Sequence, residues 1–349
     1  MTRAKQLLDA SVTPGTARTY LTGVNRLVAW LTTVCATLGI APPPLGSAAD
    51  LRLVLAEPSL IGGFLASLSI EEIAASTAST YLDGIIHYAT DLGGHPGPRD
   101  YVVSAILRGM RGSQPPRPEQ PVIQAGAMHA MVQAVPSMAL APVDAAAFVA
   151  AMLMGYYGAM RVSEYLVSGD PGKLLTRGDV TFAPAGASMT IRLKKTKNNQ
   201  VGPAQLVTIP ASHMGAAADA VCPVASVLRY VAVRDARFGA DPTKPFFSRS
   251  SGAALTPRVF NAWLKRAGDT AGIVNWRDLG SHAFKAGSTT DMVINGADFL
   301  TVKAHGRWAS DKAPASYIRK AAMTVAAKRG QAFLGAPQQR QKTSEGSVT

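Results

Sequence analysis

Apolar residues in the N-terminal third of the chain recur every three or four positions, which is the spacing of an amphipathic helix. One such stretch opens at Thr13-Pro14, a typical helix start, and continues through the apolar residues Tyr20, Val24, Leu27, Val28 and Leu31. The same spacing predicts further helices at Leu60–Leu68, Ser76–Leu92 and Tyr101–Met110. Short helices with basic outer faces predict a compact helical domain over residues 1–110.

Beyond residue 122 the pattern mixes two periods. Helical spacing predicts helices at Ala127–Val135, Val143–Val167, Val221–Arg237, Pro257–Ala271, His282–Asn295, Phe299–Ala304 and Ala313–Phe333. Short strand-like runs predict strands at Asp179–Phe182, Met189–Leu193 and Gln205–Ile209. The polar, basic stretch Lys194–Gly202 joins the last two as a hairpin loop. We therefore expect a mainly α-helical chain with a small antiparallel β-sheet.

Two stretches interrupt these patterns. Residues 111–122 (RGSQPPRPEQPV) contain four prolines, and proline removes amide donors and favours extended backbone. This composition predicts a semi-rigid linker between two domains. Residues 336–349 are polar with almost nothing to bury, which predicts a disordered tail. The second domain is then expected to cover residues 123–335.

Composition narrows the class of partner. The chain has 349 residues, with 35 Lys and Arg against 22 Asp and Glu, a formal net charge of +13. This basic balance predicts a polyanionic partner, either nucleic acid or an acidic membrane surface. A hydrophobic fraction of 47% excludes global disorder. The longest apolar run, Ala145–Met160, is shorter than the roughly 20 residues of a membrane span and predicts a buried core helix.

Other features bear on the compartment and on cofactors. Cys35 and Cys222 form no disulfide or zinc-ligand pattern, which is typical of a reducing compartment. The N-terminus lacks the apolar core of a signal peptide. We therefore expect an intracellular protein, in the cytoplasm, the nucleoid or the nucleus. The sequence shows no Walker-type loop, paired-carboxylate metal site or His/Cys cluster, so no cofactor or metal is predicted.

Five short motifs follow one another in the second domain. They are GAMRVSEYL around Arg161, TKNNQ around Lys197, SHAFK at His282, GRW at Trp308 and ASYIR at Tyr317. Each motif is weak alone, but five in this order make a coincidence improbable. In these motifs the chain resembles the tyrosine recombinase, or phage integrase, family, and the resemblance spans both domains.

The resemblance implies a fold and an activity. Residues 1–110 would form a helical, SAM-like core-binding domain, and residues 123–335 the catalytic domain of a two-domain clamp on double-stranded DNA. Tyr317 would attack a scissile phosphate to give a 3′-phosphotyrosine and a 5′-hydroxyl, and rejoining would need neither metal nor ATP. The family works as a homo-tetramer on two DNA sites in DNA recombination and integration, often of mobile elements. Its protomers exchange C-terminal helices, for which Ala321–Phe333 is the candidate here. No membrane and no small-molecule substrate are implied.

Arg161 follows a long apolar run, where an unpaired cation would be costly, and Glu164 lies three residues further on. One interpretation is a partly buried structural ion pair. The other has the planar fork of Arg161 bound to a non-bridging phosphate oxygen, with Glu164 orienting it. The position of the guanidinium at the end of an apolar helix favours the second interpretation.

Lys194, Lys195 and Lys197 lie in the predicted hairpin loop, where lysines are usually only solvated. The resemblance matches Lys197 to a lysine that reaches the active site and protonates the departing 5′ oxygen, with Lys195 as the alternative. A flexible ammonium suits that task because it can deliver a proton late in the reaction.

His282 and Lys285 are spaced i, i+3 at a predicted helix start, whose amides also favour a phosphate. A lone histidine is otherwise a core or capping residue. The family pattern here is His-x-x-Arg, so Lys285 departs from it: lysine keeps the charge but loses the bidentate fork. Reduced activity, a non-catalytic DNA-binding relative and an altered sequence all stay open.

Trp308 precedes Tyr317 by nine residues, which matches the family's His-or-Trp position. An indole N–H can donate to a phosphate oxygen, and a core tryptophan is compatible with that role. Tyr317, the expected nucleophile, is followed by a basic flank. A phenol with a pKa near 10 is a weak nucleophile at neutral pH, so cationic neighbours are expected to favour the phenolate. His305 is out of register for catalysis.

Other cations are expected to contact the DNA backbone; they are Arg18, Arg26, Arg108, Arg111, Lys194 and Lys195.

Three alternatives remain beside the recombinase. The first is a catalytically impaired DNA-binding relative, supported by Lys285. The second is a type IB topoisomerase-like enzyme, which the core-binding domain disfavours. The third, association with an anionic membrane, is weaker because no basic amphipathic helix with a large aromatic face occurs.

Overall fold

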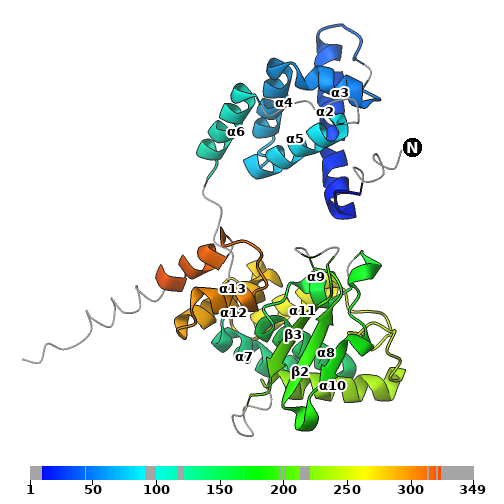
Figure 1. Ribbon diagram of the computed structural model, residues 1–349, viewed down its shortest axis with the longest axis vertical. Helices are drawn as coiled ribbons and strands as arrows, with labels where there is room; N and C mark the ends of the chain where they lie inside the picture. The colour runs from blue at the N-terminus through cyan, green and yellow to red at the C-terminus, as the bar shows by residue number, and fades with distance from the viewer. Residues whose placement is uncertain are drawn as a thin grey trace, which may run out of the picture. The chain divides into compact units, whose positions relative to one another are not determined.

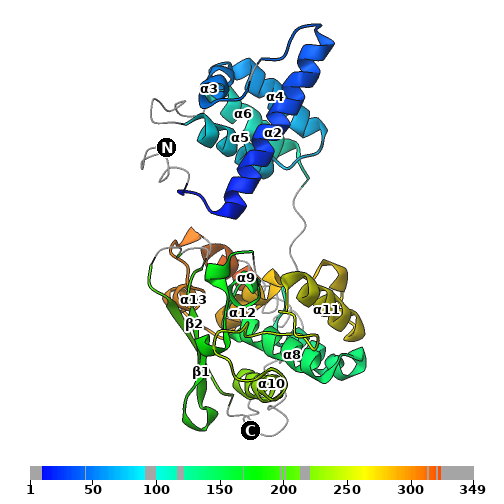
Figure 2. The same ribbon diagram turned by 90° about the vertical axis from the view of Figure 1, so that its right-hand side faces the viewer.

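The computed structural model describes residues 10–43, 45–90, 100–115, 122–167, 169–196, 199, 202–212, 221–312, 314–319 and 321–323. The chain divides into two compact units, Met1–Pro118 and Glu119–Thr349, each with its own hydrophobic core (Figure 1; Figure 2). The predicted tail at 336–349 lies outside the described residues, as do residues 116–121 of the predicted linker.

The described part of the N-terminal unit is helical. Its helices are α2 (Pro14–Thr37), α3 (Ala48–Leu55), α4 (Pro58–Ile70), α5 (Ala75–Ala89) and α6 (Tyr101–Ser113). Helix α3 was missed by the hydrophobic pattern because eight residues span barely two turns. Its signal was a capping box at the N-terminus, where Ser47 and Asp50 satisfy each other's backbone amides.

Helices α2 and α5 pack closely in this unit. A β-carbon on Gly23 would lie 2.7 Å from the backbone of Tyr81, and one on Gly84 would lie 2.5 Å from the backbone of Tyr20. Glycine on both helices therefore allows the backbones to touch. The fully buried Leu27 lies in the apolar core beneath this crossing.

Helix α6 continues through Ser113, three residues beyond the predicted domain boundary at residue 110. Met110 is buried in the core and holds the last turns of α6 against the unit. The side chain of Gln114 then bonds to the amide of Ala75 and the carbonyl of Ile73, at 3.0 Å each. The first part of the predicted linker is thus bound to the helical unit.

The C-terminal unit combines helices with one sheet. Its helices are α7 (Ala125–Ala134), α8 (Pro142–Tyr157), α9 (Val162–Tyr165), α10 (Pro223–Phe238), α11 (Pro257–Thr270), α12 (His282–Ile294) and α13 (Phe299–His305). Residues 312, 314–319 and 321–323 are also helical (Figure 1). Of the helix predicted to reach Phe333, the part beyond 323 lies outside the described residues. The fold is mainly α-helical, as predicted.

The sheet contains β1 (Val180–Phe182), β2 (Ser188–Leu193) and β3 (Gln205–Pro210), which pair antiparallel in chain order. Ile191 on the central strand is paired with Val180 on one side and Val207 on the other. All three of these side chains are buried, so one face of the sheet packs on the core. The small antiparallel sheet and its hairpin were predicted correctly.

Helix α8 is the central helix of this unit and packs against α10 and α12. Almost every residue from Ala147 to Tyr156 is buried, as expected for a core helix. Among the described residues, no single helix is long and apolar enough to cross a membrane. Helices α3 and α4 reach that length and composition only as a pair, which is bent by 89°.

The helix predicted over Val143–Val167 was wrong as a single element. Helix α8 ends at Tyr157, and Ala159 adopts a left-handed backbone with φ 43°. Arg161 is extended, with φ −81° and ψ 144°, and a new short helix, α9, starts after it. The break turns the chain at the point where the apolar run ends, which places Arg161 at the end of a core helix rather than along it.

Candidate active site

Tyr317 lies beside two of the residues predicted to act with it. Its hydroxyl is 3.1 Å from Nε2 of His282, the exposed first residue of α12. Its ring is tilted by 33° to the ring of Trp308, with 5.6 Å between centroids. Three residues that are separate in the sequence are therefore adjacent in space, while the phenol itself is half-buried.

Arg161 is the residue that caps the N-terminus of α9. The Glu164 carboxylate accepts a hydrogen bond from the backbone N–H of Arg161 and another from its Nη1, both at 2.9 Å. The Arg161 side chain is 19% exposed, whereas that of Glu164 is 2% exposed. Among the described residues Arg161 makes no other side-chain hydrogen bond. One end of its fork is held, and the rest can donate to an anion.

Glu164 bonds to a second cation besides Arg161. It takes a third bond, from Nη2 of Arg307 at 3.0 Å. Burial raises the pKa of the Glu164 carboxyl, but the charges of Arg307, Lys285 and Arg161 and the bond from the Arg161 amide outweigh burial and lower it overall. Glu164 is therefore ionised at neutral pH and is bonded to Arg161, the contact that the spacing predicted.

Lys285 lies inside the protein rather than at its surface. It is 1% exposed, its Nζ donates to the Gly306 carbonyl at 2.6 Å, and it lies 4.5 Å from the ring centroid of Trp308. Burial, together with repulsion from Arg161 and Arg307, lowers the pKa of the Lys285 ammonium to about 7. The resemblance implied a cation at this position of the active site; in the structure the amine contacts a backbone carbonyl and an aromatic face.

The environment of Tyr317 differs from the expectation that its neighbours favour the phenolate. Burial raises the pKa of the Tyr317 phenol above its usual value, and the charge of Arg161 only partly offsets this. The hydroxyl is therefore protonated at neutral pH, and attack by its oxygen needs a proton acceptor. His282 Nε2 is at hydrogen-bond distance and, in the right tautomer, can accept that proton.

The lysines of the β2–β3 hairpin have different surroundings. Lys197, the expected proton donor, lies outside the described residues. Lys195 is exposed. Lys194 is paired with Asp179 at 2.7 Å and with the Leu174 carbonyl at 3.2 Å, so its charge is used inside the unit.

The arginines expected on DNA in the N-terminal unit lie on its surface. Arg18 and Arg111 are exposed, and Arg108 is also exposed with its guanidinium 5.5 Å from the ring centroid of Tyr101. Arg26 is paired with Glu71 at 2.6 Å. An exposed pair of this kind contributes little to stability and can exchange for a phosphate contact.

Arg307 was missed as a functional candidate, although it lies inside the GRW motif. It is largely buried, and its guanidinium donates to the carbonyls of Gly158 and Ala159, at 2.8 and 3.1 Å, besides Glu164. An arginine between a glycine and a tryptophan was its only signal. No pattern in the sequence joins it to a turn almost 150 residues earlier.

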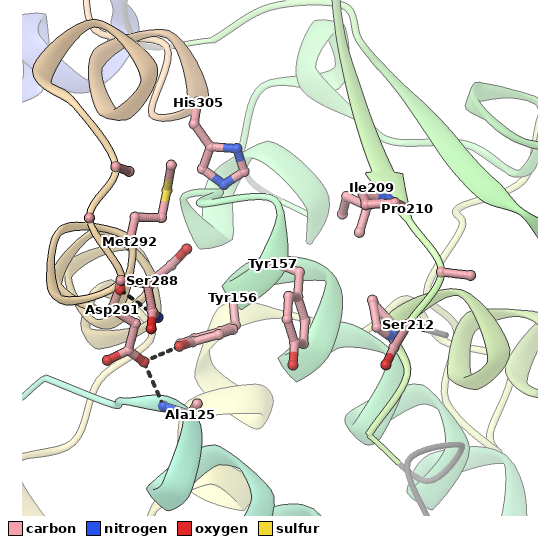
Figure 3. Close-up of a pocket in the computed structure, with 15 residues that line it drawn as sticks. Ala125, Tyr156, Tyr157, Ile209, Pro210, Ser212, Ser288, Asp291, Met292 and His305 are labelled. Carbon is pink, nitrogen blue, oxygen red and sulfur yellow. Dashed lines mark hydrogen bonds between the residues drawn. The ribbon is translucent and has the colours of Figure 1, made fainter. Parts of the chain in front are cut away.

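A cavity of about 790 Å³ opens elsewhere in the C-terminal unit, and the described residues that line it include none of the predicted catalytic ones (Figure 3). His305 faces it, as do the rings of Tyr156 and Tyr157. At its edge Asp291 accepts hydrogen bonds from the Tyr156 hydroxyl and from the amide of Ala125, which joins α12 to the start of α7. Burial, together with the bond to Asp291, raises the pKa of the Tyr156 phenol.

No protein-family model matches the chain, and no curated protein matches it. Several solved structures do match the chain. The Tn1549 transposon integrase in complex with transposon right end DNA is 14% identical, with a TM-score of 0.57 over 95% of this chain and 98% of that one.

Two further structures resemble the chain over most of its length. The XerH site-specific recombinase, in a post-cleavage complex with palindromic difH substrate, is 14% identical, with a TM-score of 0.57 over 80% of this chain and 73% of that one. A lambda integrase dimer bound to a core site is 14% identical, with a TM-score of 0.53 over 90% and 92%. The chain therefore has the fold of the tyrosine recombinases, as its motifs indicated.

Proposed function

We propose that this protein is a site-specific DNA recombinase that cuts and rejoins DNA through a tyrosine–phosphate ester. The observation that carries the proposal is the contact between the Tyr317 hydroxyl and His282 Nε2, beside Trp308 and within reach of the charge of Arg161. The likeness in fold to recombinases and integrases solved on DNA supports it. A net charge of +13 supports a DNA substrate and, with it, an intracellular site of action.

The first step forms the bond between Tyr317 Oη and the phosphorus atom of the scissile phosphate. His282 accepts the phenolic proton, because burial keeps Tyr317 protonated until attack. Arg161, held by Glu164, donates to the phosphoryl oxygens, whose negative charge grows in the transition state. The bond from phosphorus to the 5′ oxygen breaks, and Lys197 gives that oxygen a proton. The product is a 3′-phosphotyrosine and a free 5′-hydroxyl.

Rejoining is the same reaction in reverse. A 5′-hydroxyl from a second duplex loses its proton to Lys197 and attacks the phosphotyrosine, and Tyr317 leaves with the proton held by His282. The ester keeps the energy of the broken phosphodiester, so no ATP is consumed. Exchange between duplexes needs active sites on both, which is why we assign a homo-tetramer on two DNA sites. The N-terminal helical unit and the C-terminal unit would each bind one face of the DNA.

Covalent capture tests the proposal. The probe is a pool of duplexes with a nick beside a randomised central sequence, so that the short cleaved strand diffuses away and the protein stays attached. After denaturation with detergent, DNA that remains bound to the parent protein is sequenced. We expect one enriched sequence family, an adduct that survives denaturation, and its complete loss in Tyr317→Phe. Tyr157→Phe, a cavity-lining tyrosine of the same unit, is the matched control and should keep the adduct.

Each other outcome supports a different reading. DNA binding by the parent protein without any adduct supports a catalytically impaired DNA-binding relative, the second candidate. The burial of Lys285, in place of the motif arginine, is the observation that favours it. Relaxation of supercoiled plasmid without sequence enrichment supports a type IB topoisomerase-like enzyme. Absence of DNA binding contradicts all three.

A further inference from the structure

Arg307 connects two segments that are far apart in the sequence. Its Nη1 donates to the Gly158 carbonyl at 2.8 Å, and its Nη2 donates to the Ala159 carbonyl at 3.1 Å and to Glu164 at 3.0 Å. These three acceptors lie on the turn that leads from α8 through Arg161 into α9. The guanidinium therefore bonds to the turn both before and after Arg161.

The backbone on both sides of this contact is held in an uncommon conformation. Arg307 has φ 55° and Ala159 has φ 43°, the left-handed region that residues other than glycine rarely occupy. A residue in this conformation is strained and persists only when its surroundings hold it. The guanidinium of Arg307, which also donates from Nη1 to the His305 carbonyl at 3.1 Å, bonds these two strained segments to each other.

We infer that Arg307 is a positioning residue: it holds the turn that carries Arg161, and so sets the place of the phosphate-binding guanidinium beside Tyr317. This inference rests on the proposed function. Arg307 acts through Glu164, whose carboxylate it shares with Arg161, and through two carbonyls that precede Arg161 in the chain. Without these bonds the turn can relax, and Arg161 can move away from the phenol.

The same corner of the unit also positions Lys285 and Trp308. The carbonyl of Gly306, directly before Arg307, accepts a hydrogen bond from the Lys285 ammonium. Trp308, directly after Arg307, lies close to both that ammonium and the Tyr317 ring. The segment 306–308 therefore contacts several predicted site residues. Two arginines, Arg161 and Arg307, share the one Glu164 carboxylate here, so the corner keeps an excess of positive charge, which is what binding a phosphate requires.

An ordinary structural arginine in the same unit provides the matched control. Arg177 is paired with Asp235 at 3.0 Å and is partly buried, but it bonds to none of the described residues of the proposed site. If Arg307 only stabilises the fold, Arg307→Met and Arg177→Met should affect the site equally little once each protein is folded. If Arg307 positions Arg161, only Arg307→Met should change the electrostatic environment of the Tyr317 phenol.

The first measurement is the pKa of Tyr317 in the DNA-free protein, followed by NMR of ¹³Cζ-tyrosine and assigned by comparison with Tyr317→Phe. Because Arg161 lowers the pKa of the Tyr317 phenol, Arg161→Met should raise that pKa. We expect Arg307→Met to raise it in the same direction, the double variant to raise it no further than Arg161→Met, and Arg177→Met to leave it unchanged. An unchanged value in Arg307→Met would overturn the inference.

The second measurement is the single-turnover rate of adduct formation on the captured DNA sequence. A misplacement of about 1 Å can lower a rate on the order of a hundredfold. We expect Arg307→Met to slow the step by roughly tenfold to a hundredfold, with DNA affinity changed less than about threefold. Arg307→Lys keeps the charge but cannot bond to two carbonyls and a carboxylate with one fork. It should fall between the parent and Arg307→Met, and a full parental rate in both variants would contradict the inference.

The two measurements separate this inference from the proposed function. If the parent protein forms no adduct, the proposed function fails, while the NMR titration still reports whether Arg307 holds Arg161 near Tyr317. If the adduct forms and neither measurement responds to Arg307, the positioning role fails alone. Should Arg307→Met not fold, Arg307→Lys gives the same comparison with a smaller expected change.

Discussion

The two units of this protein bury different kinds of side chain. The described core of the N-terminal unit is apolar, built on residues such as Leu27, Phe64 and Leu65. Every buried charged side chain among the described residues belongs to the C-terminal unit; these are Asp144, Glu164, Asp179, Arg234 and Lys285. An apolar core stabilises a fold at no electrostatic cost, whereas a buried charge costs stability unless it is paired. The C-terminal unit therefore tolerates this electrostatic cost at particular places.

Two of these places differ in charge balance. Arg234 is 1% exposed, but Asp235 and the carbonyls of Phe246, Gly239 and Pro245 bond to its guanidinium. An arginine with these partners stabilises the fold. At the corner near Tyr317, by contrast, Arg161 and Arg307 share the one carboxylate of Glu164, and the Lys285 ammonium bonds to a backbone carbonyl. We interpret this excess of positive charge as the feature that distinguishes a site able to bind a phosphate from an arginine that only stabilises the fold.

Removal of the shared carboxylate should have the largest effect on stability. Glu164→Gln leaves Arg161 and Arg307 buried without a counter-charge, and breaking such a network costs about 4 kcal/mol. The pKa of the Glu164 carboxyl is lowered in the folded protein, so its contribution is present above pH ~4.5 and is lost as pH falls below that value. Urea unfolding at pH 7 and pH 4 checks this. A cost that is the same at both pH values would show that Glu164 does not act as an ion.

Truncation of the apolar core should come next. Leu65 is fully buried in the N-terminal unit, and Leu65→Ala is expected to cost about 3 kcal/mol through lost burial and a cavity. Because the two units have separate cores, this substitution should lower the unfolding temperature of the N-terminal unit only. Thermal unfolding followed with a spectroscopic probe in each unit tests this. An equal shift of both unfolding temperatures would contradict independent cores.

Lys285→Met should give a smaller effect that depends on pH. The pKa of the Lys285 ammonium is about 7 when folded and 10.5 when unfolded. Between those values the unfolded chain binds more protons, so the parent becomes more stable as pH rises from 7 to 10.5. Methionine removes this dependence, although it also removes the bond to Gly306. We expect the stability difference between variant and parent to shift by about 2 kcal/mol in favour of the parent from pH 7 to pH 9. A pH-independent difference would refute the low pKa.

The smallest effect is expected at the surface of the N-terminal unit. Arg26→Gln removes an exposed ion pair with Glu71 and should change stability by less than about 1 kcal/mol. Its effect should instead be on DNA, with weaker binding and a smaller dependence of affinity on salt. Fluorescence anisotropy on one duplex at several salt concentrations measures both. A large loss of stability with unchanged DNA binding would place Arg26 among the structural residues.

Much of the fold was predictable because its signals are local. Helix α11 begins at Pro257, after the capping Thr256, and ends within one residue of the prediction. The three strands and their hairpin followed from short runs that the structure pairs in the expected order. The spacing of Arg161 and Glu164 likewise identified their contact.

Other features depend on contacts between distant segments. The break after Tyr157 was hidden because the apolar pattern continues through it; it is held by Arg307, which lies about 150 residues further along the chain. The burial of Lys285 depends in the same way on the Gly306 carbonyl and the Trp308 ring. Neither partner can be inferred from the spacing of residues around Lys285.

The amino-acid sequence by itself determined the helical and strand segments, the basic charge and the identity of the candidate reactive groups, because each depends on residues that are near neighbours in the chain. Tertiary structure decided which of those groups meet. It places His282 Nε2 beside the Tyr317 hydroxyl, buries Lys285 against the Gly306 carbonyl, and bonds Arg307 to the Glu164 carboxylate that also holds Arg161. The physical reason is that pairing and burial of charge depend on distances in space, and these are set only when helices far apart in the sequence pack together.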